Sequence, residues 1–130
     1  MTGAVAPEPY YSLFRCAGDL VFLSAFGPVD ASMQVVGNTV EEQTTACMEA
    51  MGRALATAGA CLDDLVCVDV FLADLADRDA FNTAYVRCFG RRDRLPARRL
   101  YGAGSLFKGI KVEVAGIAQR GAATNANVQK

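Results

Sequence analysis

The alternation of apolar and polar residues predicts a β-hairpin in the first part of the chain. Residues 20–26 (LVFLSAF) are rich in β-branched and aromatic side chains and lie between two turn-forming pairs, Gly18-Asp19 and Gly27-Pro28. Residues 11–16 can form a short first strand, and a tight turn through residues 17–19 would join it to the second.

Two later segments show the three- and four-residue spacing of amphipathic helices. The first follows a Gly37-Asn38 turn, begins with the capping-box sequence Thr39-Val40-Glu41-Glu42 and ends at Gly59. The second is predicted over residues 78–89, with Asp77 as its N-cap. The apolar face of this second helix consists of Phe81, Tyr85, Cys88 and Phe89.

Three further strands are predicted around these helices. Residues 62–72 open with a polar turn and continue as a strand that we expect to be buried mostly on both faces, whereas residues 96–101 and 111–117 form shorter strands. The order β-β-α-β-α-β-β predicts an α+β sandwich, in which one sheet carries both helices on one face. A single copy would expose apolar residues on the other face, so we expect a closed symmetric ring of copies.

The composition fits one packed domain. With 130 residues, 52% of them apolar and 21% charged, the chain can build a single core. We assign the domain to residues 1–120 and expect a polar flexible tail over residues 121–130. A net charge of −1 without a basic stripe argues against nucleic acid as a partner. No apolar run could span a membrane and residues 1–9 show no secretory signal, so we expect a cytoplasmic protein.

Few side chains are suited to nucleophilic or metal chemistry. The chain has no histidine, which argues against Ser-His and Cys-His catalysis and against the usual Cys/His zinc sites. Its five cysteines are an odd number and include no C-x-x-C pair. We interpret them as small buried residues of a reducing compartment. Cys16 is the first exception to consider, because it lies near the site residues that are named below.

Four phrases fall in the order and spacing of the reactive-intermediate deaminase (RidA/YjgF) family: AGDLVFLS, FLADLADRDAFNTAY, PAR and IKVEVAGIA, at residues 17–24, 71–85, 96–98 and 110–118. The chain resembles this family over residues 11–120. The resemblance implies a chorismate-mutase-like α+β fold, with a single mixed β-sheet and two helices on one face, assembled as a homotrimer with sites between subunits. It also implies hydrolytic deamination of reactive 2-imino or enamine acids to 2-keto acids and ammonia, without a metal or an organic cofactor.

The resemblance also carries the family's functional residues to positions of this chain. The arginine of the P-A-R motif is Arg98, whose planar fork suits a carboxylate, and the last-strand glutamate that would orient or deprotonate the water is Glu113. The tyrosine that closes the cleft is Tyr11. The expected substrate-binding positions are Ser24, Ala25, Asn82 and the backbone carbonyl near Leu100.

Departures from the family pattern concern the wall of the expected pocket. The glycine of the family's S-G-Q stretch is Ala25 here, Phe26 follows it, and residues 101–107 (YGAGSLF) replace the usual sequence after the arginine. These changes leave two other functions open. One is a pathway-specific deaminase or tautomerase for a bulkier, aminomuconate-like unsaturated amino acid, and the other is a non-catalytic trimeric metabolite-binding protein.

Overall fold

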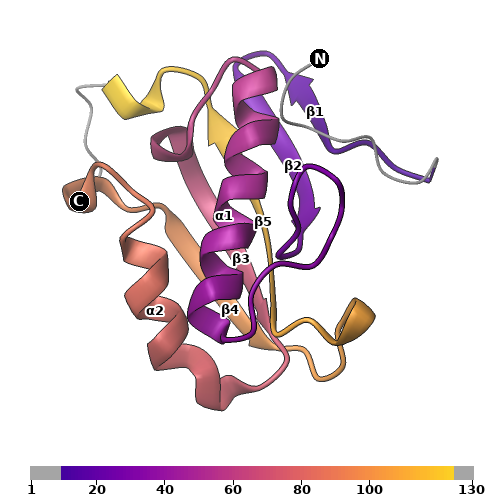
Figure 1. Ribbon diagram of the computed structural model, residues 1–130. Helices are drawn as coiled ribbons and strands as arrows, with labels where there is room; N and C mark the ends of the chain where they lie inside the picture. Colours follow the sequence, from indigo (N-terminus) through magenta and orange to yellow (C-terminus); the bar gives the residue numbers. More distant parts are fainter. Residues whose placement is uncertain (1–9, 125–130) are drawn as a thin grey trace.

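The computed structural model describes residues 10–124 and contains helices and strands in the predicted order (Figure 1). The strands in this part of the chain are β1 (Phe14–Ala17), β2 (Leu20–Phe26), β3 (Leu65–Leu72), β4 (Ala97–Gly102) and β5 (Val112–Gln119). The α-helices are α1 (Val40–Thr57) and α2 (Arg78–Val86). The prediction of one α+β unit with the order β-β-α-β-α-β-β is confirmed.

The strands of the described region form one five-stranded mixed sheet in the order β1-β2-β5-β3-β4. β3 and β4 run parallel, and the other neighbouring strands run antiparallel. The predicted hairpin joins β1 to β2, and Gly18 adopts a left-handed φ of +57° in its turn, where a side chain would be strained. β5, the last strand of the described residues, lies at the centre of the sheet.

Helix α1 begins and ends as its sequence predicts. The Thr39 side chain accepts a hydrogen bond from the Glu42 N–H at 3.1 Å, and the Glu42 carboxylate accepts one from the Thr39 N–H at 3.2 Å. At the other end, Gly59 has a φ of +80°, and the Ala60 N–H bonds the Leu55 carbonyl at 2.8 Å. The predicted capping box and glycine stop are therefore confirmed.

Helix α2 differs from its prediction at both ends. Asp77 precedes the helix, but its side chain makes no capping hydrogen bond. Instead, Asp74 accepts a hydrogen bond from the Ala76 N–H at 2.9 Å and begins a 3₁₀ turn that leads into α2. The helix ends at Val86, three residues earlier than expected, although Phe89 beyond it is still buried.

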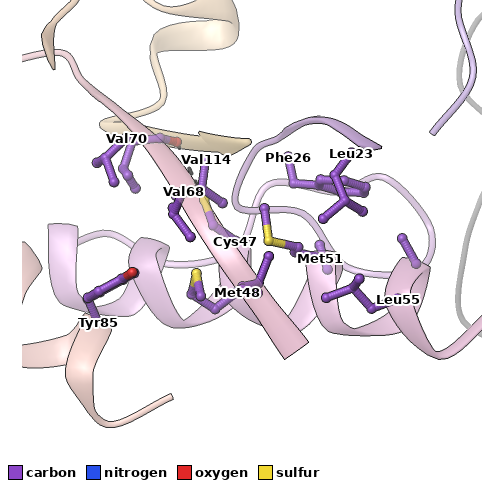
Figure 2. Packing of buried hydrophobic residues seen from close by; sticks show 14 of the residues in the cluster. Leu23, Phe26, Cys47, Met48, Met51, Leu55, Val68, Val70, Tyr85 and Val114 are labelled. Carbon is purple, nitrogen blue, oxygen red and sulfur yellow. Dashed lines mark hydrogen bonds between the residues drawn. The ribbon is translucent and has the colours of Figure 1, made fainter. Parts of the chain in front are cut away.

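Both helices lie on one face of the sheet, with α1 packed against α2, and the hydrophobic core fills the space beneath them (Figures 1 and 2). Since α1 is amphipathic, its apolar stripe enters this core between the helix and the sheet. Figure 2 shows the stripe together with side chains of β2, β3, β5 and α2: Cys47, Met48, Met51, Leu55, Leu23, Phe26, Val68, Val70, Val114 and Tyr85.

The prediction that β3 is buried on both faces is wrong for a single copy. Val68 and Val70 are fully buried beneath the helices, whereas Phe71 on the opposite face is only half-buried. A register shift between Leu65 and Cys67 turns Val66 outward as well. We call the face without helices the open face. Large apolar side chains lie exposed on it, among them Phe22, Val66 and Tyr101.

The end of the described chain contains one further turn. Within the segment 121–130, for which a flexible tail is predicted, Ala122–Thr124 form a 3₁₀ turn, and the Ala123 N–H donates to the Asp64 carboxylate at 2.8 Å. The remainder of that predicted tail, 125–130, and the segment 1–9 lie outside the described residues.

The cysteines are only partly as expected. All five are free thiols, and Cys47 is buried. Cys67 and Cys88 are intermediate, whereas Cys16 and Cys61 are exposed. The prediction of a buried side chain is therefore wrong for Cys61, which lies in the turn before β3 rather than in a strand.

Candidate functional site

The seven predicted site residues fall into two sets at separate places in the sheet. The first set, which we call the arginine half, consists of Arg98 and Leu100 on β4 and Asn82 on α2. The second set, the glutamate half, consists of Tyr11 before β1, Ser24 and Ala25 on β2, and Glu113 on β5. Strand β3 lies between β4 and β5, so it separates the two halves.

Arg98 and Glu113 also lie on opposite faces of the sheet. Arg98 is paired with Val68, which is fully buried beneath the helices, whereas Glu113 is paired with Phe71 on the open face. Because paired residues of neighbouring strands point to the same side, the side chains of Arg98 and Glu113 point away from each other. One copy of the chain therefore does not bring them together. The prediction that Glu113 points opposite to Val112 and Val114 is confirmed.

The guanidinium of Arg98 lies over two aromatic rings of α2. Its central carbon is 5.1 Å from the centre of the Tyr85 ring and 5.5 Å from that of Phe81. Burial lowers the pKa of Arg98, and the nearby Arg78 cation acts in the same direction. An arginine nevertheless stays protonated at neutral pH, so the site carries a partly buried positive charge.

No carboxylate among residues 10–124 forms an ion pair with Arg98. The next residue, Arg99, is different, because its guanidinium contacts the Asp69 carboxylate at 2.7 Å on the open face. A partly buried cation without an anionic partner is unfavourable unless an anion binds to it. The charge of Arg98 is therefore available to an acidic ligand, whereas that of Arg99 is neutralised within the chain.

Two buried oxygen atoms on α2 lack a hydrogen-bond partner within the described residues. They are Oδ1 of Asn82 and the hydroxyl oxygen of Tyr85. Asn82 and Tyr85 are three residues apart on the helix and therefore lie on the same side of it. Since buried polar groups normally have partners, the unpaired Oδ1 of Asn82 marks the α2 side of the arginine half as a place where a polar ligand could be held.

The glutamate half is held by hydrogen bonds at an irregular place in the sheet. The pairing of β2 with β5 shifts between Leu23 and Phe26, so Ser24 and Ala25 form a bulge. The Ser24 N–H donates to the Leu13 carbonyl at 2.9 Å, and the Ser24 hydroxyl donates to the Ser12 carbonyl at 2.5 Å. These bonds hold the segment that carries Tyr11, whose side chain is exposed, beside the bulge.

Ala25 and Glu113 belong to the same face of the sheet. They immediately precede Phe26 and Val114, which are paired with each other and buried beneath the helices. Because neighbouring residues of a strand point to opposite sides, Ala25 and Glu113 both face the open side. Partial burial there raises the pKa of Glu113 above that of an ordinary glutamate.

The sequence analysis missed the part that Phe81 and Tyr85 play at this site. Their i, i+4 spacing and aromatic character predicted the core face of α2, and both are indeed buried. The same face of α2 also contacts Arg98, and this contact depends on the position of β4 relative to the helix. The local sequence does not reveal the contact, because Arg98 is more than ten residues away from both rings along the chain.

Neither a metal centre nor a membrane helix is found in the described part of the chain. Residues 10–124 contain no group of three or more Asp, Glu, Cys or His side chains that could hold a metal ion. No helix in this region combines the length and the apolar character that crossing a bilayer requires.

Comparisons with known proteins identify the class to which this fold and these residues belong. The endoribonuclease L-PSP family matches residues 1–120. The chain therefore belongs to this family, which is the RidA/YjgF family that the sequence resembles.

Individual relatives support this assignment. A RutC family protein of Saccharolobus solfataricus is 36% identical over 118 residues, which cover 88% of this chain and 92% of that protein. The human 2-iminobutanoate/2-iminopropanoate deaminase is 30% identical over 127 residues, covering 97% and 89% of the two chains. The structure of E. coli TdcF with bound serine is similar, with a TM-score of 0.83 and 26% identity over 91% of this chain and 94% of that one.

Proposed function

We propose that this protein hydrolyses reactive 2-imino or enamine acids to 2-keto acids and ammonia. The observation that carries the proposal is the partly buried cation of Arg98, which no carboxylate of residues 10–124 neutralises. Its planar fork can take a carboxylate through two parallel hydrogen bonds. The names of relatives such as the human 2-iminobutanoate/2-iminopropanoate deaminase support the same class of substrate.

The complete site combines the arginine half of one copy with the glutamate half of another. Arg98 and Glu113 point to opposite faces of one chain, so a second copy is needed to bring them to a single substrate. The open face carries the exposed apolar side chains that such an assembly would bury. We expect the assembly to be a homotrimer, as the resemblance to the family implies, because a closed ring of copies leaves no open face without a partner.

The reaction needs only protein side chains and water. Arg98 holds the substrate carboxylate, and the Oδ1 atom of Asn82 accepts a hydrogen bond from the protonated imine nitrogen. Glu113 takes a proton from water as the water oxygen bonds to the C=N carbon, and the electron pair of the C=N bond moves to nitrogen. Glu113 returns that proton to the amine, the C–N bond breaks, and ammonia leaves as the hydroxyl proton passes back to the carboxylate. The 2-keto acid remains.

The other residues of the glutamate half have supporting parts in this proposal. Tyr11 closes the site over the substrate, and Ser24 contributes a polar contact and holds the segment that carries Tyr11. The backbone carbonyl near Leu100 helps to orient the water. Ala25 replaces a smaller residue of the family pattern and narrows the approach to the substrate. No nucleic acid is part of the proposal, because a net charge of −1 offers little attraction to a phosphate backbone.

The experiment that tests the function is a coupled assay in which a pyridoxal phosphate dehydratase supplies 2-iminobutanoate, and the rate of imine loss is measured. Wild-type protein should accelerate hydrolysis, and Arg98→Ala and Glu113→Gln should each reduce this acceleration by about a hundredfold or more. Failure of the wild-type protein to accelerate hydrolysis of this substrate and of bulkier imino acids, combined with tight binding of 2-oxobutanoate, would identify a metabolite-binding protein instead.

A mixture of the two inactive variants tests the shared site. After subunit exchange, random pairing at each interface places an intact arginine half beside an intact glutamate half in about one case in four, so about a quarter of wild-type activity should return. A mixture whose subunits exchange, as shown by mass spectrometry of differently tagged copies, but which stays inactive would contradict a site made from two copies.

A further inference from the structure

Two aromatic rings of α2 form a surface that supports Arg98, and we call Phe81 and Tyr85 together the aromatic shelf. The rings stack on each other with their centres 5.2 Å apart and their planes inclined by 26°. Both side chains are almost completely buried, with exposed fractions of 0% for Phe81 and 3% for Tyr85. The shelf is therefore a rigid part of the core, and Figure 2 shows Tyr85 on α2 at the edge of the packed cluster.

The contact between the shelf and Arg98 leaves the hydrogen-bonding groups of the arginine available. A cation over an aromatic face is attracted to the ring electrons through its charge, and this attraction does not require its N–H groups. The described residues offer Arg98 no carboxylate, so the shelf is the favourable contact that holds its guanidinium. A long, flexible side chain held in this way loses less freedom when a carboxylate binds to it.

We propose that Tyr85, with Phe81, is a positioning residue that holds the guanidinium of Arg98 in the orientation in which it binds the substrate carboxylate. This inference rests on the proposed function, because it assigns the carboxylate of a 2-imino or 2-keto acid to Arg98. The ring of Tyr85 carries the effect. Its hydroxyl is buried without a partner in residues 10–124, so a direct contact between hydroxyl and substrate is the competing explanation.

Removal of the ring and removal of the hydroxyl distinguish these explanations. Tyr85→Leu removes the aromatic face, whereas Tyr85→Phe keeps it and removes only the oxygen. Phe89→Leu is the matched control, because Phe89 is buried in the segment that follows α2 and packs edge-on against Tyr85, with ring centres 5.0 Å apart. If Tyr85→Leu does not fold, Phe81→Leu removes the other ring over which Arg98 lies.

The measurement is the Kd of 2-oxobutanoate by calorimetry, with the neutral 2-oxobutanamide as a second ligand. The cation–π attraction predicts that Tyr85→Leu weakens 2-oxobutanoate binding by about three- to thirtyfold. Tyr85→Phe and Phe89→Leu should bind 2-oxobutanoate within about twofold of wild type, even if Phe89→Leu melts at a lower temperature. Binding of the neutral amide should not change in any variant. In an Arg98→Ala background, Tyr85→Leu should cause no further loss.

Several results would overturn the proposal. Equal weakening by Phe89→Leu, or equal loss of the neutral amide, would mean that Tyr85 acts only through the stability of the core. Equal weakening by Tyr85→Phe would assign the effect to the hydroxyl. If wild-type protein binds 2-oxobutanoate and Tyr85→Leu binds it equally well, the positioning role alone is wrong. If wild-type protein binds no 2-keto acid and hydrolyses no imine, the proposed function is wrong and the positioning role falls with it.

Discussion

The two halves of the candidate site are held in different ways. In the arginine half, a cation rests on buried aromatic rings at the edge of the hydrophobic core. In the glutamate half, a bulge of β2 and two hydrogen bonds from Ser24 hold residues that are partly exposed. The first half is therefore fixed by side-chain packing and the second by the backbone.

This difference indicates what each half contributes. A rigid, partly dehydrated cation is suited to recognising one feature of the substrate, its carboxylate, before any reaction takes place. A carboxyl group with a raised pKa on a more open surface is suited to exchanging protons with water. Since neither half can do both, the activity should depend on contact between copies. Four predictions test this division of the site.

The largest effect is expected from a substitution that separates the copies. Phe22→Asp places a charge on the open face, where Phe22 is 42% exposed and next to Ile117, so it should yield a folded monomer without detectable imine hydrolysis. Light scattering and circular dichroism would measure mass and folding. Met33→Asp is the control, because Met33 is 43% exposed in a turn of positive φ that aspartate tolerates. An active Phe22→Asp monomer would contradict the division of the site.

The next largest effect is expected at Arg98. Arg98→Met keeps an apolar stem on the aromatic rings and removes the charge, so kcat/KM should fall on the order of a thousandfold through the loss of two charged hydrogen bonds. The free energy of unfolding should stay equal or rise, because a partly buried cation without an internal partner is removed. Urea unfolding measures this, and Arg87→Met, a substitution of the exposed residue that follows α2, should alter neither quantity. A strongly destabilised Arg98→Met would show that the arginine is structural.

Glu113→Gln should reduce kcat on the order of a hundredfold, as expected for the loss of a general base. Burial raises the pKa of Glu113, so in wild type kcat should increase as the pH rises through that raised pKa, and the variant should lack this acidic limb. Ionising a carboxyl whose folded-state pKa is raised costs stability. Its contribution to the free energy of unfolding is therefore present at low pH and is lost as the pH rises through that pKa.

Rate profiles and unfolding curves between pH 4 and 8, recorded for wild type, Glu113→Gln and the exposed control Glu49→Gln, would check this prediction. An acidic limb that persists in Glu113→Gln would assign the titration to another group.

The smallest effect is expected at Ser24. Ser24→Ala removes the hydrogen bond to the Ser12 carbonyl but leaves the backbone bond to Leu13, so Tyr11 should be held less firmly and KM should rise about threefold, with kcat nearly unchanged. Thr45→Ala removes a similar bond, from a hydroxyl to the Glu41 carbonyl on α1, and serves as the control. A change in kcat with constant KM would give Ser24 a part in the chemistry itself.

The elements of the fold could be predicted from local sequence, because helices and strands follow the spacing of apolar residues and their caps. β2 and the capping box of α1 are examples. The sequence of β3 led to one wrong prediction, that the strand is buried on both faces. The register shift that turns Val66 outward depends on the partner strand β5. The prediction of Asp77 as the capping residue was also wrong, because an extra 3₁₀ turn that begins at Asp74 precedes α2, and only the local backbone path reveals it.

The site could be predicted only as a set of residues. The alternation in β5 was enough to place Glu113 opposite Val112 and Val114, and this is confirmed. The relation between Glu113 and Arg98 depends on the strand order, which puts β3 between them and turns their side chains to opposite faces. Contacts between Arg98 and the rings of Phe81 and Tyr85 likewise join segments that are distant in sequence.

The central position of β5 has a consequence for how the protein is made. Since translation proceeds from the N-terminus, the ribosome releases β1, β2, β3 and β4 before the strand that joins the hairpin to the parallel pair. The nascent chain can therefore hold two separate pieces of sheet but no continuous one until residues 112–119 have left the exit tunnel. Premature termination before β5 would release a fragment with two additional unpaired strand edges, on β2 and β3, which is a substrate for chaperones and proteases rather than a smaller version of the domain.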